Sequence, residues 1–175
     1  MELWKGGGST SLKNASSNEA NHWTNPDNAH TEDGAYANTN DHLSFEWYHG
    51  FDLGSEIPDG AVISGIEVRM KGHAVSTNTG LGVRISWDGG SSNNGSTISR
   101  TFNTGADQEL VWGGPNDTWG RSWTKSEFQS NNFWVRAGQG NADQQVEVDV
   151  ISVVVYYNNA LVAQVPLTYR VARRN

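Results

Sequence analysis

Apolar and polar residues alternate along most of the chain beyond residue 42. The first such stretch places an apolar or aromatic residue, or a histidine, at every second position: Leu43, Phe45, Trp47, His49, Phe51 and Leu53. Successive side chains of a β-strand point to opposite faces, so a period of two predicts a strand with one buried face. We therefore expect this stripe, Trp47 included, to face a core, with His49 as a core histidine.

The same alternation returns in six later segments, which lie at residues 66–74, 81–87, 98–102, 110–112, 133–137 and 144–157. The residues expected to be buried in these strands are Ile66, Val68, Val83, Ile85, Val148, Val150 and Val154. Residues 151–157 are apolar on both faces apart from Ser152. That pattern predicts a strand in the middle of a sheet or beneath a partner.

Turn signals separate these segments, and helix signals are nearly absent. Asp88-Gly89-Gly90 is typical of a hairpin turn, and Thr124 followed by Glu127 fits the capping box of a single helical turn. The fold class predicted is all-β: an antiparallel jelly-roll β-sandwich of about eight strands with extended arms at both ends. We expect an N-terminal arm over 1–19, the sandwich over 20–158, and a C-terminal arm or exchanged strand over 159–175.

Composition narrows the possible functions. The chain has 175 residues, a net charge of -7, no Cys and 8 Trp. The absence of Cys excludes disulfides, thiolate metal sites and cysteine nucleophiles. An acidic body disfavours nucleic acid as a ligand. No apolar run approaches the ~18 residues of a membrane-spanning helix, so no membrane partner is expected. The first residues lack the apolar segment of a secretory signal.

Both ends carry apolar residues that suit a partner. The tail alternates as a strand does, but Pro166 removes a backbone donor and confines it to an edge or exchanged position. We expect it to pair with its own sandwich or with a neighbouring subunit. The predicted partner-binding residues are Leu3, Trp4, Leu161, Val165, Leu167, Tyr169, Arg170, Arg173 and Arg174.

Two sets of motifs carry a family resemblance. The first comprises Trp23-x-Asn25-Pro26-x-Asn28-Ala29, Asp33-Gly34-x-Tyr36-Ala37 and Ile57-Pro58-x-Gly60-Ala61-x-Ile63-x-Gly65-Ile66-x-Val68. The second comprises Trp112-Gly113, Asp117-Thr118-Trp119-Gly120, Trp123-Thr124, Phe133-x-Val135-Arg136 and the run from Val146 to Tyr157. Over residues 20–158 this pattern resembles discoidin-like jelly-roll domains of bacteriophage virion proteins. The resemblance implies a virion location and a structural subunit that decorates a head or builds a tail, with other virion proteins and its own copies as partners.

No catalytic or metal-binding motif stands out. The five His show no ligand spacing, and no nucleophile motif or phosphate-binding loop is present, so we expect a non-enzymatic protein without a cofactor. Calcium is the one ion considered, because Asp27, Asp33, Asp41, Asp52 and Asp59 lie near predicted turns and calcium takes oxygen ligands. Turn formation explains the same aspartates.

The Trp content is the best argument for ligand binding. Flat aromatic faces stack on sugars, and polar neighbours bind their hydroxyls. The candidates are Trp112, Trp119 and Trp134. Two functions therefore stay open: a virion structural protein, or a carbohydrate-binding or receptor-binding module with exposed Trp residues. Packing within the sandwich or against another subunit is the competing explanation for the same side chains.

Overall fold

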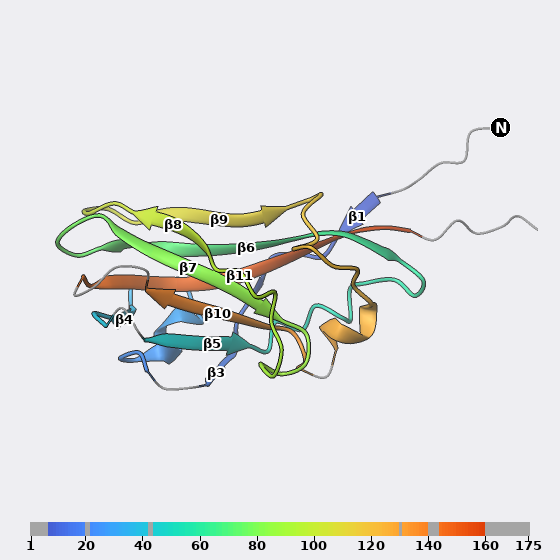
Figure 1. Cartoon of the computed structure of the whole chain (residues 1–175), viewed down its shortest axis with the longest axis horizontal. Coiled ribbons are helices and arrows are strands. Elements are labelled where there is room, and N and C mark those ends of the chain that lie inside the picture. Colours follow the sequence, from blue (N-terminus) through green and yellow to red (C-terminus); the bar gives the residue numbers. More distant parts are fainter. Residues whose placement is uncertain (1–6, 20–21, 42–43, 130, 140–143, 160–175) are drawn as a thin grey trace, which may run out of the picture.

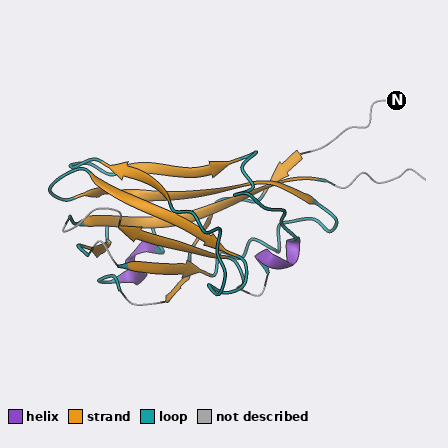
Figure 2. Ribbon diagram, in the orientation of Figure 1, coloured by secondary structure: helices purple, strands orange, loops and turns teal. Residues whose placement is uncertain are grey.

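The protein is a two-layered jelly-roll β-sandwich. The structure is a computed structural model that describes residues 7–19, 22–41, 44–129, 131–139 and 144–159. In this part of the chain two antiparallel sheets pack face to face (Figures 1 and 2). The predicted all-β fold class is confirmed, and every strand predicted within the described residues is present.

One sheet has six strands and the other five. The six-stranded sheet runs β1 (Gly7–Ser9), β11 (Val146–Asn158), β6 (Val62–Ala74) and β9 (Gln108–Gly114), with β2 (Lys13–Asn14) and β4 (Ala37–Thr39) also paired to β11. The five-stranded sheet runs β3 (Ser17–Glu19), β5 (Phe45–His49), β10 (Trp134–Gln139), β7 (Thr79–Ser86) and β8 (Ile98–Phe102). The strands that sequence alone does not predict are β1 to β4, because each has only two or three residues, too few to show alternation.

Two 3-10 turns, η1 (Pro26–Ala29) and η2 (Lys125–Phe128), are the helical elements of the described residues. The predicted capping box begins η2, where the Thr124 amide donates to Glu127 Oε2 at 2.7 Å. In the described part of the chain, no helix is long and apolar enough to cross a membrane.

The predicted N-terminal arm is largely part of the sandwich. β1 and β2 pair with β11, and β3 pairs with β5. The expected boundary at residue 19 is therefore wrong for residues 7–19. These residues are too polar to suggest burial, but backbone hydrogen bonding to a strand edge requires no apolar side chains. Residues 1–6 and 160–175, including all nine predicted partner-binding residues, lie outside the described residues.

β11 lies inside its sheet, as its apolar second half predicts. A register irregularity between Val148 and Val150 changes which side chains face inward. Val146 and Val148 face the core before it, and Ile151, Val153 and Val155 do so after it. Val150 and Val154 are each 7% exposed but lie outside the core cluster. All three valines are buried as predicted, but Val150 and Val154 lie on the side of β11 away from the core cluster.

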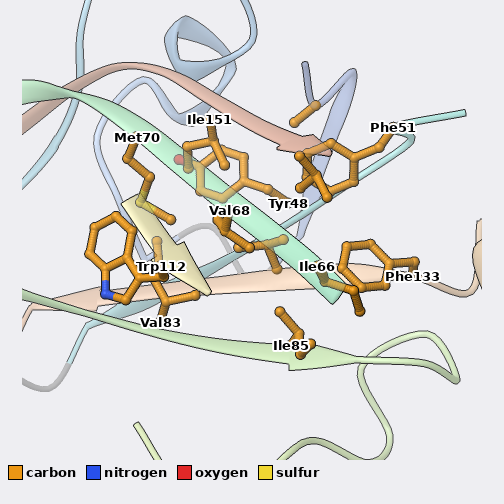
Figure 3. Packing of buried hydrophobic residues seen from close by; sticks show 14 of the residues in the cluster. Tyr48, Phe51, Ile66, Val68, Met70, Val83, Ile85, Trp112, Phe133 and Ile151 are labelled. Atoms are coloured by element: carbon orange, nitrogen blue, oxygen red, sulfur yellow. The ribbon is translucent and has the colours of Figure 1, made fainter. Parts of the chain in front are cut away.

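The core fills the space between the two sheets (Figure 3). Ile66, Val68, Val83 and Ile85 are fully buried there, as predicted. β5 differs from the prediction, because Tyr48 and Glu46 face inward and Trp47 is only partly buried on the outer face. The buried Glu46 carboxylate accepts a hydrogen bond from the His22 amide at 2.9 Å. This inversion of β5 creates the site described next.

Candidate functional site

Aromatic side chains gather on the outer face of the five-stranded sheet. β5 and β10 pair so that Arg136 lies opposite Trp47 and Gly138 opposite Phe45. Val135 and Ala137, which alternate with these residues, fill the core. Phe45, Trp47 and Trp134 are each partly exposed on this face. We call these three residues the aromatic platform.

Several contacts fix the Trp134 ring. It stacks on His49 with the ring centroids 4.4 Å apart and meets Trp47 edge-on at 6.1 Å. Its indole Nε1 donates to the Asn131 carbonyl at 2.6 Å. Gly90 packs so closely that an added Cβ would come within 3.1 Å of the indole. The ring is thus held in place while one part stays open to solvent.

A groove of about 180 Å³ lies beside the platform. Gly82 of β7 and Gly138 of β10 pair directly, so neither adds a side chain of its own to this part of the sheet, while the Thr97 side chain lies directly over Gly82. The residues around the hollow are Ser44, Gly82, Arg84, Thr97, Arg136, Gly138 and Gln139. We call this hollow the glycine-floored groove.

Two arginines stand side by side in the groove. Arg84 and Arg136 are direct partners across β7 and β10. The Arg136 guanidinium lies 3.7 Å from the centre of the Phe45 ring, and Arg84 Nε donates to Thr97 Oγ1 at 2.7 Å. Burial, and after it the charge of Arg84, lowers the pKa of Arg136 from its usual value. Arginine still stays protonated at neutral pH, so the groove holds two positive charges.

A larger hollow of about 490 Å³ opens at the end of the sandwich, between the segments 50–55 and 128–133. Asn131 lines it and also binds His49 Nδ1 through its side-chain oxygen at 2.9 Å. Asp52 and Asn131 adopt left-handed backbone there, with φ of 48° and 63°. The hollow and the aromatic platform thus share Asn131 as a common neighbour.

The predicted ligand-binding tryptophans separate into two groups. Trp134 is partly exposed on the platform, so it is placed where a ligand can reach it. Trp112 is fully buried and Trp119 is 7% exposed. Their Nε1 atoms donate to the carbonyls of Ile98 and Ile66, at 2.9 Å and 3.0 Å. Both are core residues with satisfied donors, so their assignment as exposed binding residues is wrong.

Sequence reasoning missed most of the face. Phe45 and Trp47 were assigned to the core because they share a stripe with Phe51 and Leu53. A usable signal lies in Arg84 and Arg136, since each follows a core valine, Val83 or Val135, at the next position. Adjacent residues of a strand point to opposite faces, which puts both arginines on the outside.

The described residues show no group of three or more His, Cys, Asp or Glu that could hold a metal ion. The aspartates considered for calcium have other contacts. Asp33 accepts from the Ala35 amide, Asp27 from Asn18 Nδ2, and Asp59 from Lys125 Nζ. These three carboxylates stabilise turns and pair with neighbouring side chains.

No protein-family model matches the chain, and no match was found among curated proteins. Two solved structures share its general shape. The CBM22-1 xylan-binding domain from Paenibacillus barcinonensis Xyn10C is 10% identical with a TM-score of 0.42, and the match covers 86% of this chain and 85% of that one. The N-terminal CBM22-1–GH10 modules of Clostridium thermocellum xylanase Xyn10B, complexed with xylohexaose, are 8% identical with a TM-score of 0.41, over 74% of this chain and 23% of that one. At these values the likeness carries no information on function.

Proposed function

We propose that the protein is a non-catalytic carbohydrate-binding module and that glycan binds on the outer face of its five-stranded sheet. The observation that supports this most directly is the aromatic platform. Its three large rings are partly exposed on a sheet whose opposite side supplies the core. Exposed apolar patches rimmed by polar groups mark ligand or partner sites in soluble proteins.

The chemistry of the platform suits a sugar. Pyranose rings present C–H groups on their faces and hydroxyls at their edges. Trp47 and Trp134 offer partly exposed rings, while Arg84 and Arg136 offer donors nearby. Sites of this kind combine aromatic walls with a few placed polar groups. Nucleophilic or acid–base chemistry is not part of the proposal, because no carboxylate pair lines the groove.

The test is a binding series with neutral hexasaccharides of different backbones, measured by calorimetry and affinity electrophoresis. Trp134→Ala is expected to weaken binding at least about ten-fold, the size of an aromatic hot spot. Trp134→Phe keeps a ring and should retain part of the affinity. Tyr157→Ala, on the other sheet, is the control for loss of an aromatic residue elsewhere. Binding that survives both Trp134→Ala and Trp47→Ala would contradict the proposed face.

The virion role implied by the family resemblance stays a prediction. The residues expected to contact other virion subunits lie outside the described part of the chain. A glycan-binding sandwich carried on a particle would combine both functions, with the face described above directed at a surface glycan. Co-purification of the protein with intact particles would support the virion location.

A further inference from the structure

The two arginines of the glycine-floored groove have no acidic partner. Among the described residues, no carboxylate lies within ion-pair distance of Arg84 or Arg136. The Nε atom of Arg136 is buried and makes no hydrogen bond. Like charges placed directly across a sheet destabilise it, and a buried donor without an acceptor costs free energy. An anion bound from outside would offset the charge of this pair.

The geometry holds both guanidinium groups for such an anion. Arg136 is fixed over the Phe45 ring by a cation–π contact, and Arg84 is held through Nε by Thr97. The terminal nitrogens of Arg84 make no intramolecular hydrogen bond among the described residues. The planar guanidinium fork matches the two oxygens of a carboxylate.

The size and charge of the surroundings restrict the anion. The groove of about 180 Å³ is smaller than the ~300–1,000 Å³ of sites that enclose whole drug-sized ligands, so it accepts a single group. Glu19 lies in the same row, across Trp47 from Arg136, and the chain carries a net charge of -7. Both features repel a polyanion and favour a ligand with isolated negative charges.

We propose that Arg84 and Arg136 select glycans bearing a carboxylate, as in uronic acid residues, and seat that group in the glycine-floored groove while neighbouring sugar rings stack on the aromatic platform. This inference rests on the proposed carbohydrate-binding function.

The experiment compares a neutral hexasaccharide with the same backbone carrying one uronate group, by calorimetry on the full chain. The uronate form should bind about ten-fold more tightly, as charge-assisted hydrogen bonds allow. Arg84→Gln and Arg136→Gln should each remove most of that preference and lower the affinity for the neutral sugar by a smaller factor, because the Gln amide keeps a hydrogen-bond donor. Arg100→Gln is the matched control, because Arg100 is exposed and pairs with the inward-facing Leu81.

The other outcomes are distinct. Equal affinity for both sugars, still dependent on Trp134, would overturn the carboxylate preference and leave the proposed function standing. No binding of either sugar would overturn both. If a sulfated glycan or single-stranded DNA bound as tightly as the uronate sugar or more tightly, general electrostatic attraction rather than a carboxylate site would explain the binding. The same would follow if Arg100→Gln reduced the uronate preference as much as Arg84→Gln does. Thermal denaturation checks that each variant folds.

Discussion

The outer faces of the two sheets differ in how their charges are satisfied. On the six-stranded sheet, Arg69 binds Glu67 at 2.6 Å, Lys71 binds Glu32, and His73 lies between two carboxylates, 2.7 Å from Asp107 Oδ1 and 3.2 Å from Glu147 Oε2. On the five-stranded sheet, Arg84 and Arg136 face each other beside exposed aromatic rings. The charged side chains of the six-stranded sheet pair with one another within the chain, whereas the outer face of the five-stranded sheet leaves charges and aromatic rings available to a ligand.

The difference shows which features serve the fold. Paired charges cost little on a surface and keep it soluble. A like-charged pair and exposed tryptophans contribute no comparable stability, so function is the better explanation for them. The following predictions test this contrast between a face whose charges are paired within the chain and a face whose charges are not.

The largest expected effect separates the inner and outer sides of β11. Ile151→Asp places a carboxylate in the core and should unfold the domain, because an unpaired buried charge costs several kcal/mol against ~5–15 kcal/mol of total stability. Val150→Asp, one residue earlier, is also at a buried position (7% exposed) but shares the face of its cross-strand partner Lys71, so it should cost less stability than Ile151→Asp. Urea denaturation followed by Trp fluorescence measures both. Equal unfolding of the two variants would show that the irregularity does not separate the two sides.

That irregularity marks a limit of sequence reasoning. Alternation predicts the strands because one face of each is buried, and it places Ile66, Val68, Val83 and Ile85 correctly. It fails where the register shifts, since nothing in the run from Val148 to Val150 signals an extra residue. The structure supplies the cause in Asp149, whose buried carboxylate accepts hydrogen bonds from the amides of Asp33 and Gly34, at 3.1 Å and 3.0 Å.

The candidate site was harder to predict from sequence than the fold. An aromatic stripe has the same period whether it faces a core or a ligand. The pattern of β5 therefore does not decide whether Trp47 or Tyr48 is the buried residue. A buried acid decided the outcome: Glu46, on the side of Tyr48, binds the amides of His22 and Trp23, at 2.9 Å and 3.3 Å. Such long-range hydrogen bonds leave no trace in a local pattern. Trp134 can be identified from sequence, because its apolar neighbours Phe133 and Val135 point toward the core and the residue between them must then point outward.

The second prediction concerns the loss of an ion pair on the outer face of the six-stranded sheet. Glu67 is 7% exposed and accepts hydrogen bonds from Arg69 and from the Tyr156 hydroxyl. Glu67→Ala leaves Arg69 Nε and the Tyr156 hydroxyl without this acceptor and should lower the free energy of unfolding by about 1–3 kcal/mol. Glu109→Ala is the control, since its contact with Arg69 is longer, at 3.4 Å, and more exposed. A loss no greater than that of the control would mean that this pairing contributes nothing to stability.

The third prediction concerns the stability of the N-terminal strands at low pH. Hydrogen bonds from Lys13 and then Ser11 lower the pKa of Glu56 from 4.5 to about 2. Because the folded-state pKa is the lower one, this stabilisation is complete above about pH 4.5 and is lost as the pH falls through about 2. The side chain is 32% exposed, so after allowance for solvent screening Glu56→Gln should cost at most about 1 kcal/mol at pH 7.

Hydrogen exchange at the Thr10 and Ala15 amides, which bind the carbonyls of Val155 and Ile151, measures this anchor locally. In the wild type their protection should fall between pH 4.5 and 2, while Glu56→Gln shows the lower protection already at neutral pH. Amides of β10 serve as the internal control, because no contact of Glu56 reaches them. Unchanged protection of Thr10 in the variant would show that backbone pairing alone holds the N-terminal strands.

The smallest expected effect lies on the open face and has the opposite sign. Arg84→Gln removes one member of the like-charged pair, so the free energy of unfolding should stay level or rise by a few tenths of a kcal/mol. The gain should shrink as salt is added, because screening weakens the repulsion that the variant relieves. Chemical denaturation at low and moderate ionic strength measures this, with Arg100→Gln as the control for loss of a positive charge elsewhere. A loss of stability in Arg84→Gln would make the arginine a structural residue. A gain accompanied by loss of uronate preference would show that the protein retains a destabilising pair because its ligand completes it.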